Sequence, residues 1–239
     1  MTENRTKSKK GKGLVVAIDG PSAAGKSTLA KLVAKELDYL HLDTGAMYRA
    51  VGWKADRLQI PLHEGDKLAA LARDLKIRFK CDADGRTRVI ADGEDVTGKI
   101  RSRHAGELAS RVSAVPGVRR AMVTLQRQMG ACGGVVAEGR DMQTVVFPGA
   151  DVKIFLTASV AERSRRRQLE LQQKGIEVGL AEIESEIEKR DRRDSTRADS
   201  PLRAAPDAHI VDTDKKTTEK VLDETLKIVA RRLKETREP

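Results

Sequence analysis

The segment with the clearest chemical signature is residues 20–28, which fits the pattern G-x-x-x-x-G-K-[ST]. An apolar run, residues 14–18, precedes it and a helix-forming run, residues 28–37, follows it. In a strand–loop–helix unit of this kind, backbone N–H groups surround phosphate oxygens and the helix N-terminus adds positive potential. The members of the loop are Gly20, Pro21, Ser22, Ala23, Ala24, Gly25, Lys26, Ser27 and Thr28. A chance glycine-rich turn is the alternative, and the flanking strand and helix argue against it.

The last residues of this loop suggest a nucleoside triphosphate as the ligand. Lys26 would neutralise charge on the β and γ oxygens, and Ser27 offers the hydroxyl that such loops place on Mg²⁺. A phosphate-binding loop alone does not say which group receives the phosphate. Three further clusters of charged residues bear on that question.

Two of these clusters each follow a predicted strand. In the first, Thr44 is expected to be a helix N-cap, with Arg49 about one turn further on and facing the crevice at the strand ends. An arginine there suits a phosphate monoester, although this segment taken alone favours a surface arginine beside a routine cap. In the second, Gly139 would permit a sharp exit, so that Arg140 and Asp141 turn back over the crevice. The alternative is a turn with an incidental ion pair.

The third cluster is residues 190–197, in which Arg190, Arg192, Arg193 and Arg197 alternate with Asp191 and Asp194. Like charges three or four positions apart on a helix cost a few tenths of a kcal/mol per pair, and an anion would relieve that repulsion. A triphosphate and its acceptor are such anions. A neighbouring run has two equal interpretations, ATP contact or a solvated face. It consists of Arg163, Arg165, Arg166 and Arg167.

Strand-length apolar runs alternate with helical patterns. This alternation predicts an α/β protein of three layers, in which a parallel sheet lies between two layers of helices. The five expected strands are residues 14–19, 39–42, 134–137, 152–156 and 208–211. Helices are expected after the phosphate loop, from 44 to about 58, across much of 99–129 with a break at Pro116-Gly117, and from 217 to about 234.

Two segments interrupt this alternation. Residues 77–80 and 88–90 predict a β-hairpin around the turn at residues 82–85, and Asp92-Gly93 predicts a second turn. Residues 159–198 are helical, highly charged and poor in large apolar side chains, as expected of a lid that can move. We therefore predict a single domain over residues 13–239. Its core is 13–62, 98–158 and 199–239, its insertion is about 63–97, and its lid is about 159–198.

The chain has 239 residues and a net charge of +10, of which the first twelve residues supply +4. That segment lacks apolar periodicity and is expected to be a disordered, solvated tail. No apolar run follows it as in a signal peptide, and none approaches the length of a membrane span. Cys81 and Cys132 fit no metal or redox spacing. We expect a cytoplasmic protein, with no membrane or obligate protein partner, and a monomer.

Taken together, these motifs closely resemble those of the bacterial cytidylate kinases, the CMP and dCMP kinases of the nucleoside monophosphate kinase group. The resemblance extends from about Gly13 to the C-terminus. It is carried by the segments 18–28, 42–49, 138–148 and 190–197, of which Asp-Thr-Gly-Ala-Met-Tyr-Arg and Gly-Arg-Asp are far more specific than the phosphate loop. The hairpin insertion is similar to the family's extended monophosphate-binding region.

The resemblance implies ATP and CMP or dCMP as substrates, with Mg²⁺, and a role for each site residue. Arg49, Arg140, Arg190 and Arg197 would surround the acceptor phosphate, with Thr44 close by. Asp194 would contact the ribose. The set that would recognise cytosine is Ser110, Arg119 and Asp141. Lys26, Arg140, Arg190 and Arg197 would carry the transfer itself.

Hydrogen-bond chemistry supports that cytosine set. A carboxylate accepts a hydrogen bond from the N4 amino group, and an arginine donates to the ring acceptors. Uracil reverses this edge, and a site that requires a hydrogen bond can discriminate by roughly 10⁴ or more. Asp141 is therefore the expected determinant of base preference. The alternative, which can hold as well, is that Asp141 orients Arg140 through an ion pair. Gln143 stands where the family usually has glycine, and a side chain there is expected to alter the loop beside the cytosine pocket.

Two other functions remain as alternatives. The first is a kinase for another small acceptor, such as UMP, AMP, shikimate or gluconate. The second is an ATP-dependent protein that binds nucleic acid, which the net positive charge would favour. The chain has only one Trp, two Tyr and three Phe for base stacking, so we expect no nucleic-acid partner.

Overall fold

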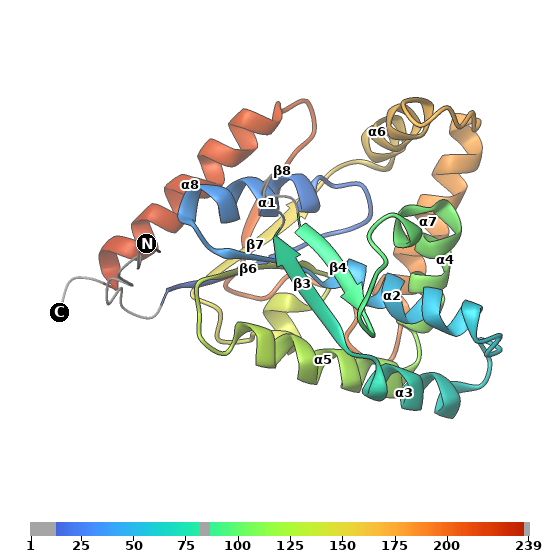
Figure 1. The fold of residues 1–239 in the computed structure, drawn as a ribbon. Helices are drawn as coiled ribbons and strands as arrows, with labels where there is room; N and C mark the ends of the chain where they lie inside the picture. The colour runs from blue at the N-terminus through green and yellow to red at the C-terminus, as the bar shows by residue number, and fades with distance from the viewer. Residues whose placement is uncertain (1–12, 82–86, 237–239) are drawn as a thin grey trace, which may run out of the picture.

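The computed structural model describes residues 13–81 and 87–236. Its centre is a five-stranded parallel sheet with the strand order β2-β6-β1-β7-β8 (Figure 1). The strands are Val15–Asp19 (β1), Leu40–Asp43 (β2), Val135–Gly139 (β6), Val152–Thr157 (β7) and His209–Asp212 (β8). Central strands of a parallel sheet are covered on both faces, which explains why β1 and β6 have continuous apolar runs rather than alternating ones. The predicted sheet is confirmed, and each strand begins within one residue of its expected position.

The helices form a layer on each face of this sheet. Two helices, Lys26–Leu37 (α1) and Thr218–Glu235 (α8), pack together over Val16, Ile18 and Ile154. Three others, Thr44–Arg57 (α2), Arg103–Val112 (α4) and Pro116–Gly130 (α5), share the core of the opposite face with Ala17 and Leu42. The side chains of β1 therefore alternate between two cores, as expected of a three-layer α/β fold.

The break between α4 and α5 lies just before the expected position. Pro116 is the first residue of α5, and the interruption falls on residues 113–115. The first helical position tolerates proline because its missing N–H would have no intrahelical partner there. The sequence analysis predicted the break at Pro116-Gly117, whereas these residues are the first two of α5. The break therefore lies just before the predicted position.

The insertion between α2 and α4 contains the predicted hairpin. Strands Ile77–Cys81 (β3) and Thr87–Ala91 (β4) pair antiparallel, and Glu94–Asp95 (β5) extends them to a three-stranded sheet. The expected turn at residues 82–85 lies outside the described residues. The second turn is confirmed, since Asp92 and Gly93 have φ angles of 50° and 86°. A helix that was not predicted, Gly65–Asp74 (α3), packs on α5, and a short 3₁₀ helix, Lys99–Arg101, precedes α4.

The expected helical segment after β7 consists of Val160–Gln172 (α6) and Leu180–Thr196 (α7). These helices stand to one side of the sheet in Figure 1 and have a small apolar cluster of their own, formed by Leu171, Ile183 and Ile187. This cluster is separate from the two cores that hold the sheet. The segment contacts the rest of the molecule through polar groups and through Ala23 of the phosphate loop, which packs against this cluster.

Three expectations from composition concern residues that the structure describes only in part or not at all. Among the described residues, no helix has both the length and the apolar character that a membrane crossing requires. Cys132 is an exposed free thiol, whereas the side chain of Cys81 lies outside the described part of the chain. The N-terminal tail, residues 1–12, lies outside it as well.

Candidate active site

The phosphate-binding loop joins β1 to α1 at the carboxyl edge of the sheet. Gly20 has a φ of 150°, and a Cβ atom there would lie 2.4 Å from the carbonyl oxygen of Leu156. Gly25 adopts a left-handed conformation and is the N-cap of α1, with no side chain capping the helix. The first N–H groups of α1 therefore remain available for an anion. Glycine is required at residue 20 by space and at residue 25 by conformation.

Lys26 lies inside this loop and is only 7 % exposed. Its Nζ atom donates to the carbonyl oxygen of Pro21 at 2.6 Å. Burial lowers the pKa of Lys26 well below its usual range, and the positive charges of Arg140 and Arg190 lower it further. These electrostatic effects place the lysine next to the arginines of two distant segments. A bound phosphate group would offset the repulsion among them.

Ser27 contacts a carboxylate to which the sequence analysis assigned no role. Its Oγ donates to Glu138 Oε2 at 2.6 Å, and His41 Nε2 lies 3.0 Å from the other carboxylate oxygen. Glu138 is 3 % exposed and His41 is 8 % exposed. The signal for Glu138 was its position at the end of β6, the strand that pairs with β1.

A hydroxyl and a carboxylate in contact at the edge of a phosphate loop fit Mg²⁺, which prefers oxygen ligands and keeps bonds to water and phosphate. Within residues 13–81 and 87–236, no group of three or more His, Cys, Asp or Glu side chains could hold a metal ion.

The start of α2 differs from the sequence prediction. Asp43, not Thr44, is the N-cap, and its Oδ1 accepts a hydrogen bond from the backbone N–H of Ala46 at 2.8 Å. Thr44 is the first helical residue, and its hydroxyl donates to the carbonyl oxygen of Glu138 at 2.6 Å. It thereby joins the ends of β2 and β6. Arg49 Nη2 donates to Asp43 Oδ2 at 2.9 Å, while Arg49 Nε has no partner.

Arginines from two distant segments, the end of β6 and α7 with its C-cap, meet around one carboxylate, Asp194 of α7. Arg140 Nε donates to Asp194 Oδ2 at 2.8 Å, and Arg197 Nη1 lies 3.8 Å from Oδ1. Burial lowers the pKa of Arg190 to about 10, and the charges of Arg140 and Arg49 add to that effect. Arg190 Nε and Arg197 Nη2 are buried without a hydrogen-bond partner. The cluster thus has more cationic groups than its carboxylate can neutralise, which is the electrostatic environment of an anion site.

A second ion pair, between Arg119 of α5 and Asp141, is almost fully buried at 2 % exposure for each residue. The Arg119 guanidinium also lies over the Tyr48 ring, 5.6 Å from its centre. Asp141 therefore pairs with Arg119, and Arg140 pairs with Asp194. The alternative in which Asp141 orients Arg140 through an ion pair is wrong.

Ser110, the third residue of the expected base-recognition set, lies on α4 and is 3 % exposed. Its Oγ accepts a hydrogen bond from Arg193 of α7 at 2.7 Å. Ser113, at the end of the same helix, donates to the carbonyl oxygen of Ser110 and accepts from Arg119 through its own carbonyl oxygen. The structure therefore links Ser110 to Arg119 through the end of α4.

Asp19 is a further residue that sequence analysis missed. It ends β1, is fully buried, and accepts hydrogen bonds from the backbone N–H groups of Met142 and Gln143 at 3.0 and 2.9 Å. These bonds fix the start of a π-helical turn, Met142–Val146, directly after Asp141. Burial raises the pKa of Asp19 to about 7, although both N–H groups oppose the shift.

The two loop residues around this turn have different roles from those expected. Gly139 does not adopt a positive φ. It is required by space, because a Cβ atom there would lie 2.8 Å from Met142 Cε and from Thr44 Oγ1. The Gln143 side chain extends toward β7, where Nε2 donates to Ile154 O and Oε1 accepts from Ala205 N–H. It joins three segments and does not point toward Asp141.

The arginines of α6 have protein partners in this structure, and contact of any of them with ATP stays a prediction. Arg163 is 4 % exposed and donates to the carbonyl oxygen of Ser22 and to Asp191, so it braces the phosphate loop against α7. Arg166 binds the hydroxyl and carbonyl oxygens of Thr213. Arg165 is an exposed partner of Glu162, as a solvated face predicts.

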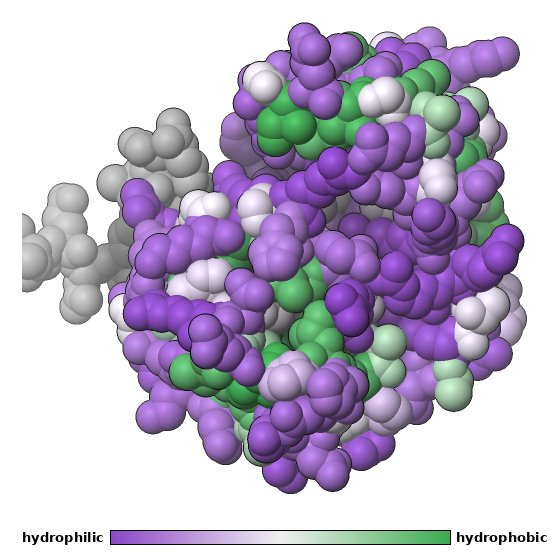
Figure 2. Space-filling model, turned by 90° about the vertical axis from the view of Figure 1, so that its right-hand side faces the viewer, coloured by the Kyte–Doolittle hydropathy of each residue, from purple (hydrophilic) through white to green (hydrophobic). Residues whose placement is uncertain are grey.

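The surface around these groups is hollowed and polar. Figure 2, which views the molecule from the side of α6 and α7, shows hydrophilic residues around a hollow between the upper lobe and the body.

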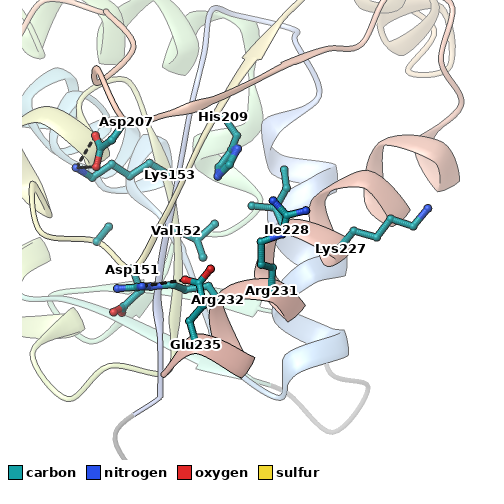
Figure 3. Close-up of a pocket in the computed structure, with 11 residues that line it drawn as sticks. Asp151, Val152, Lys153, Asp207, His209, Lys227, Ile228, Arg231, Arg232 and Glu235 are labelled. Atoms are coloured by element: carbon teal, nitrogen blue, oxygen red, sulfur yellow. Dashed lines mark hydrogen bonds and ion pairs between the residues drawn. The ribbon is translucent and has the colours of Figure 1, made fainter. Parts of the chain in front are cut away.

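A separate pocket of about 230 Å³ lies at the opposite, amino-terminal edge of the sheet (Figure 3). There Lys153 Nζ is bound by both oxygens of Asp207, at 3.0 and 2.9 Å. Its charge is neutralised locally, unlike that of Arg190.

Comparisons with known proteins agree with this geometry. The family model described as Cytidylate kinase matches residues 16–231. A cytidylate kinase from Syntrophotalea carbinolica is 49 % identical over 219 residues, covering 92 % of this chain and 93 % of that protein. One from Geobacter sulfurreducens is 50 % identical over 225 residues, covering 94 % and 96 %.

Some relatives are longer than this chain. A bifunctional pantoate ligase/cytidylate kinase from Synechococcus sp. strain JA-3-3Ab is 50 % identical over 222 residues, which span 92 % of this chain and 41 % of that protein. Among solved structures, an uncharacterized protein from Eubacterium ventriosum has a TM-score of 0.51 at 10 % identity, covering 91 % of this chain and 98 % of the other. That likeness concerns the fold alone. Because the family model covers most of the sequence and half of the residues are shared with curated members, the chain belongs to the cytidylate kinase family.

Proposed function

We propose that this protein transfers the γ-phosphoryl group of ATP to CMP or dCMP, giving ADP and CDP or dCDP, in pyrimidine nucleotide metabolism. Membership of the family supports the reaction. The observation that carries it for this chain is the cluster of Arg140, Arg190 and Arg197 around Asp194, in which Arg190 and Arg197 have unsatisfied donors. Arg49 is near enough for its charge to act on Arg190. The cluster lies close to Lys26, so an acceptor phosphate bound there would face the phosphates of ATP.

On the ATP side, residues 20–28 would hold the triphosphate through backbone N–H groups, with Lys26 on the β and γ oxygens. Its present bond to Pro21 O would be exchanged for bonds to phosphate. Ser27, with Glu138 behind it, would hold Mg²⁺, and the cation when bound supplies neutralisation of the β and γ oxygens.

On the acceptor side, the four arginines would bind the monophosphate, with Thr44 shaping the floor of the site and Asp194 contacting the ribose. The base would be recognised by Ser110, Arg119 and Asp141. Cytosine can donate from N4 to the Asp141 carboxylate, whereas uracil would place a carbonyl oxygen there. A buried carboxylate that lost its donor would be costly, which gives the site its preference.

The mechanism that follows is an in-line displacement with a loose transition state, in which charge spreads over the transferring oxygens. The chain's contribution is to align the acceptor oxygen with the γ-phosphorus and to offset that charge with Lys26, Arg140, Arg190 and Arg197. Arginines in this role are worth about 10³–10⁵ in rate. No general base is needed, and we assign none.

Water competes with CMP as the acceptor, so access to the site must be controlled. We propose that residues 159–198 act as a lid, which brings Arg190 and Arg197 into place when it closes. The insertion at residues 63–97 would border the monophosphate side. Closure only around a bound acceptor would limit ATP hydrolysis.

A kinase of free nucleotides works where ATP and CMP are made, so we propose a cytoplasmic enzyme that needs no membrane, nucleic acid or protein partner. We also propose that it is a monomer. Sedimentation equilibrium over a range of protein concentrations tests the last point, and a mass of about 26 kDa throughout is expected.

The test of the reaction is a coupled assay of ADP release with Mg·ATP and, separately, CMP, dCMP, UMP, AMP and GMP. Strong turnover with CMP and dCMP over a low ATP-only background is expected. Turnover mainly with another mononucleotide would support the kinase assignment and contradict the assignment of a cytosine-binding site. If no mononucleotide stimulated turnover of folded protein, the acceptor assignment would fail, and ATPase activity with RNA or DNA would be measured next.

A further inference from the structure

Helix α7 carries one arginine, Arg193, that bonds to a residue of the expected base-recognition set, Ser110. Arg193 lies three positions after Arg190 and four before Arg197, the C-cap of the helix, so it is about one turn from each of them. Arg193 Nη1 donates to Ser110 Oγ at 2.7 Å and lies 3.3 Å from Glu107 Oε1. The Arg193 guanidinium therefore bonds to two residues of α4.

The two partners of Arg193 differ in their exposure to solvent. The Glu107 side chain is 56 % exposed, so its pairing with Arg193 is screened and weak. Ser110 is 3 % exposed, so the bond to its hydroxyl is shielded from water and charge-assisted. The Ser110 contact is the one that can hold α7 in a defined position.

A serine hydroxyl that accepts one hydrogen bond keeps its proton and a second lone pair. Among the described residues, Arg193 is the only group bonded to Ser110 Oγ. The hydroxyl can therefore bond to Arg193 and to a nucleobase at the same time. A hydroxyl polarised by one partner binds the other more strongly, because hydrogen bonds in a chain reinforce each other.

We propose that Arg193 is a positioning residue, through which recognition of the base at Ser110 fixes the place of α7 and of its phosphate-binding arginines. The inference rests on the proposed function, since it takes Ser110 as a contact of the base. A base that bonds to Ser110 tightens the Arg193 contact and holds Arg190 and Arg197 over the phosphates. A base that does not bond there gains nothing from Arg193. Discrimination between CMP and UMP then appears in kcat as well as in KM.

The first experiment compares Arg193→Met with the wild type, using CMP and UMP as acceptors. Methionine keeps much of the length of the side chain and removes its donors. Arg193 is partly exposed, so the variant is expected to fold. kcat/KM for CMP should fall about tenfold, the size of one charge-assisted hydrogen bond, with a clear part of the loss in kcat. UMP should be little affected, and an unchanged CMP:UMP ratio would overturn the proposal.

A double-mutant cycle tests whether Arg193 acts through Ser110. In a Ser110→Ala background, Arg193→Met should cause no further loss with CMP. The same tenfold loss in that background would show that Arg193 acts elsewhere and would overturn the proposal. Glu107→Gln is the matched control, because it removes the other partner of Arg193 and leaves Ser110 intact. It should preserve the CMP:UMP ratio.

A second link between the same two helices separates base sensing from simple docking. Arg103 of α4 pairs with Glu182 and Glu186 of α7. Arg103→Met should change turnover with CMP and UMP alike, and a selective loss with CMP would contradict the role given to Arg193. A wild type inactive with CMP would disprove the proposed function itself. An active wild type with an unchanged ratio in Arg193→Met would disprove only this inference.

Discussion

Burial affects the charged residues of the site differently, according to the partners each one has. Asp141 has a full ionic partner in Arg119, whereas the guanidinium of Arg190 meets mainly other cations. A buried charge without a partner is expensive, and it becomes favourable only when a ligand of opposite sign arrives. The buried cations that lack an ionic partner in the free protein are therefore the ones expected to bind the substrate phosphates.

The role of Asp141 in base preference can be tested at the level of one atom. Asp141→Asn replaces an acceptor oxygen by an amide that can donate to the O4 carbonyl of uracil. KM for CMP should rise by about 10² or more, while KM for UMP should change little or fall. The measurement is kcat and KM for both nucleotides, with Asp141→Ala alongside. Equal losses on CMP and UMP in both variants would assign Asp141 a structural role only.

Asp19 makes a prediction about pH. Its pKa is about 7 in the folded protein against about 3.8 in the unfolded chain, so between these values the folded state holds a proton that the unfolded state has lost. The free energy of unfolding should therefore fall as pH rises from 5 to 7.5, by about 2–3 kcal/mol.

Asp43 and Asp194 have lowered pKa values and act in the opposite sense, but only at more acidic pH. Urea unfolding at pH 5 and 7.5 measures the effect. Asp19→Asn should be less stable at both pH values, because one backbone N–H loses its acceptor, and its stability should vary less with pH. An equally steep decline in the variant would assign the pH dependence to other groups.

At the level of the elements, the sequence was sufficient wherever a continuous apolar run or a helix signal acted locally. The strands β1 and β6 and the helix after the phosphate loop needed no tertiary information. The helix α3 was missed because its apolar face is small, with only Leu68 and Ala72 buried. The π-helical turn after Asp141 was missed because it depends on two bonds to Asp19, a residue 123 positions away.

The pairing of charged side chains could not be predicted from the sequence either, because the partners lie far apart along the chain. The sequence brought Arg140 and Asp141 together as neighbours, yet their side chains turn to different partners on α7 and α5. Likewise, Glu138 gained a role only once β6 was placed beside β1, within reach of Ser27. Motif spacing identified the site, and the sheet order determined which groups meet in it.

Gln143 gives a prediction for the connection between elements. Gln143→Ala leaves the N–H of Ala205 and the carbonyl of Ile154 buried without this partner, which should cost about 1–3 kcal/mol of unfolding free energy. Gln143→Met fills the same volume without the bonds, so it separates the hydrogen bonds from the cavity. Urea denaturation gives the free energy, and steady-state kinetics should give an unchanged CMP:UMP ratio. A changed CMP:UMP ratio with an unchanged free energy of unfolding would show that Gln143 affects recognition of the base.

At the level of the whole molecule, the structure has two rigid cores around one sheet and a third, small cluster in α6 and α7. Because Leu171, Ile183 and Ile187 form a cluster apart from those cores, we expect the two helices to open as a unit while the sheet stays folded. They contact the rest of the molecule through polar groups, Arg163 and Arg193 among others, and through Ala23 of the phosphate loop. Anionic substrates would add contacts to the same surface.

This arrangement predicts a ranking of backbone amide exchange. Amides of α7 should exchange faster than those of β1 and β6 in the free protein, and a mixture of CMP and a non-hydrolysable ATP analogue should slow α7 selectively. Hydrogen–deuterium exchange read by mass spectrometry measures both. Ile183→Ala should speed exchange in α6 and α7 and leave β1 unchanged. Ile154→Ala, in the sheet core, should destabilise the whole molecule by about 2–5 kcal/mol. If Ile183→Ala accelerated exchange equally in β1, the two helices would be part of one cooperative unit with the sheet, and a lid that opens on its own would be excluded.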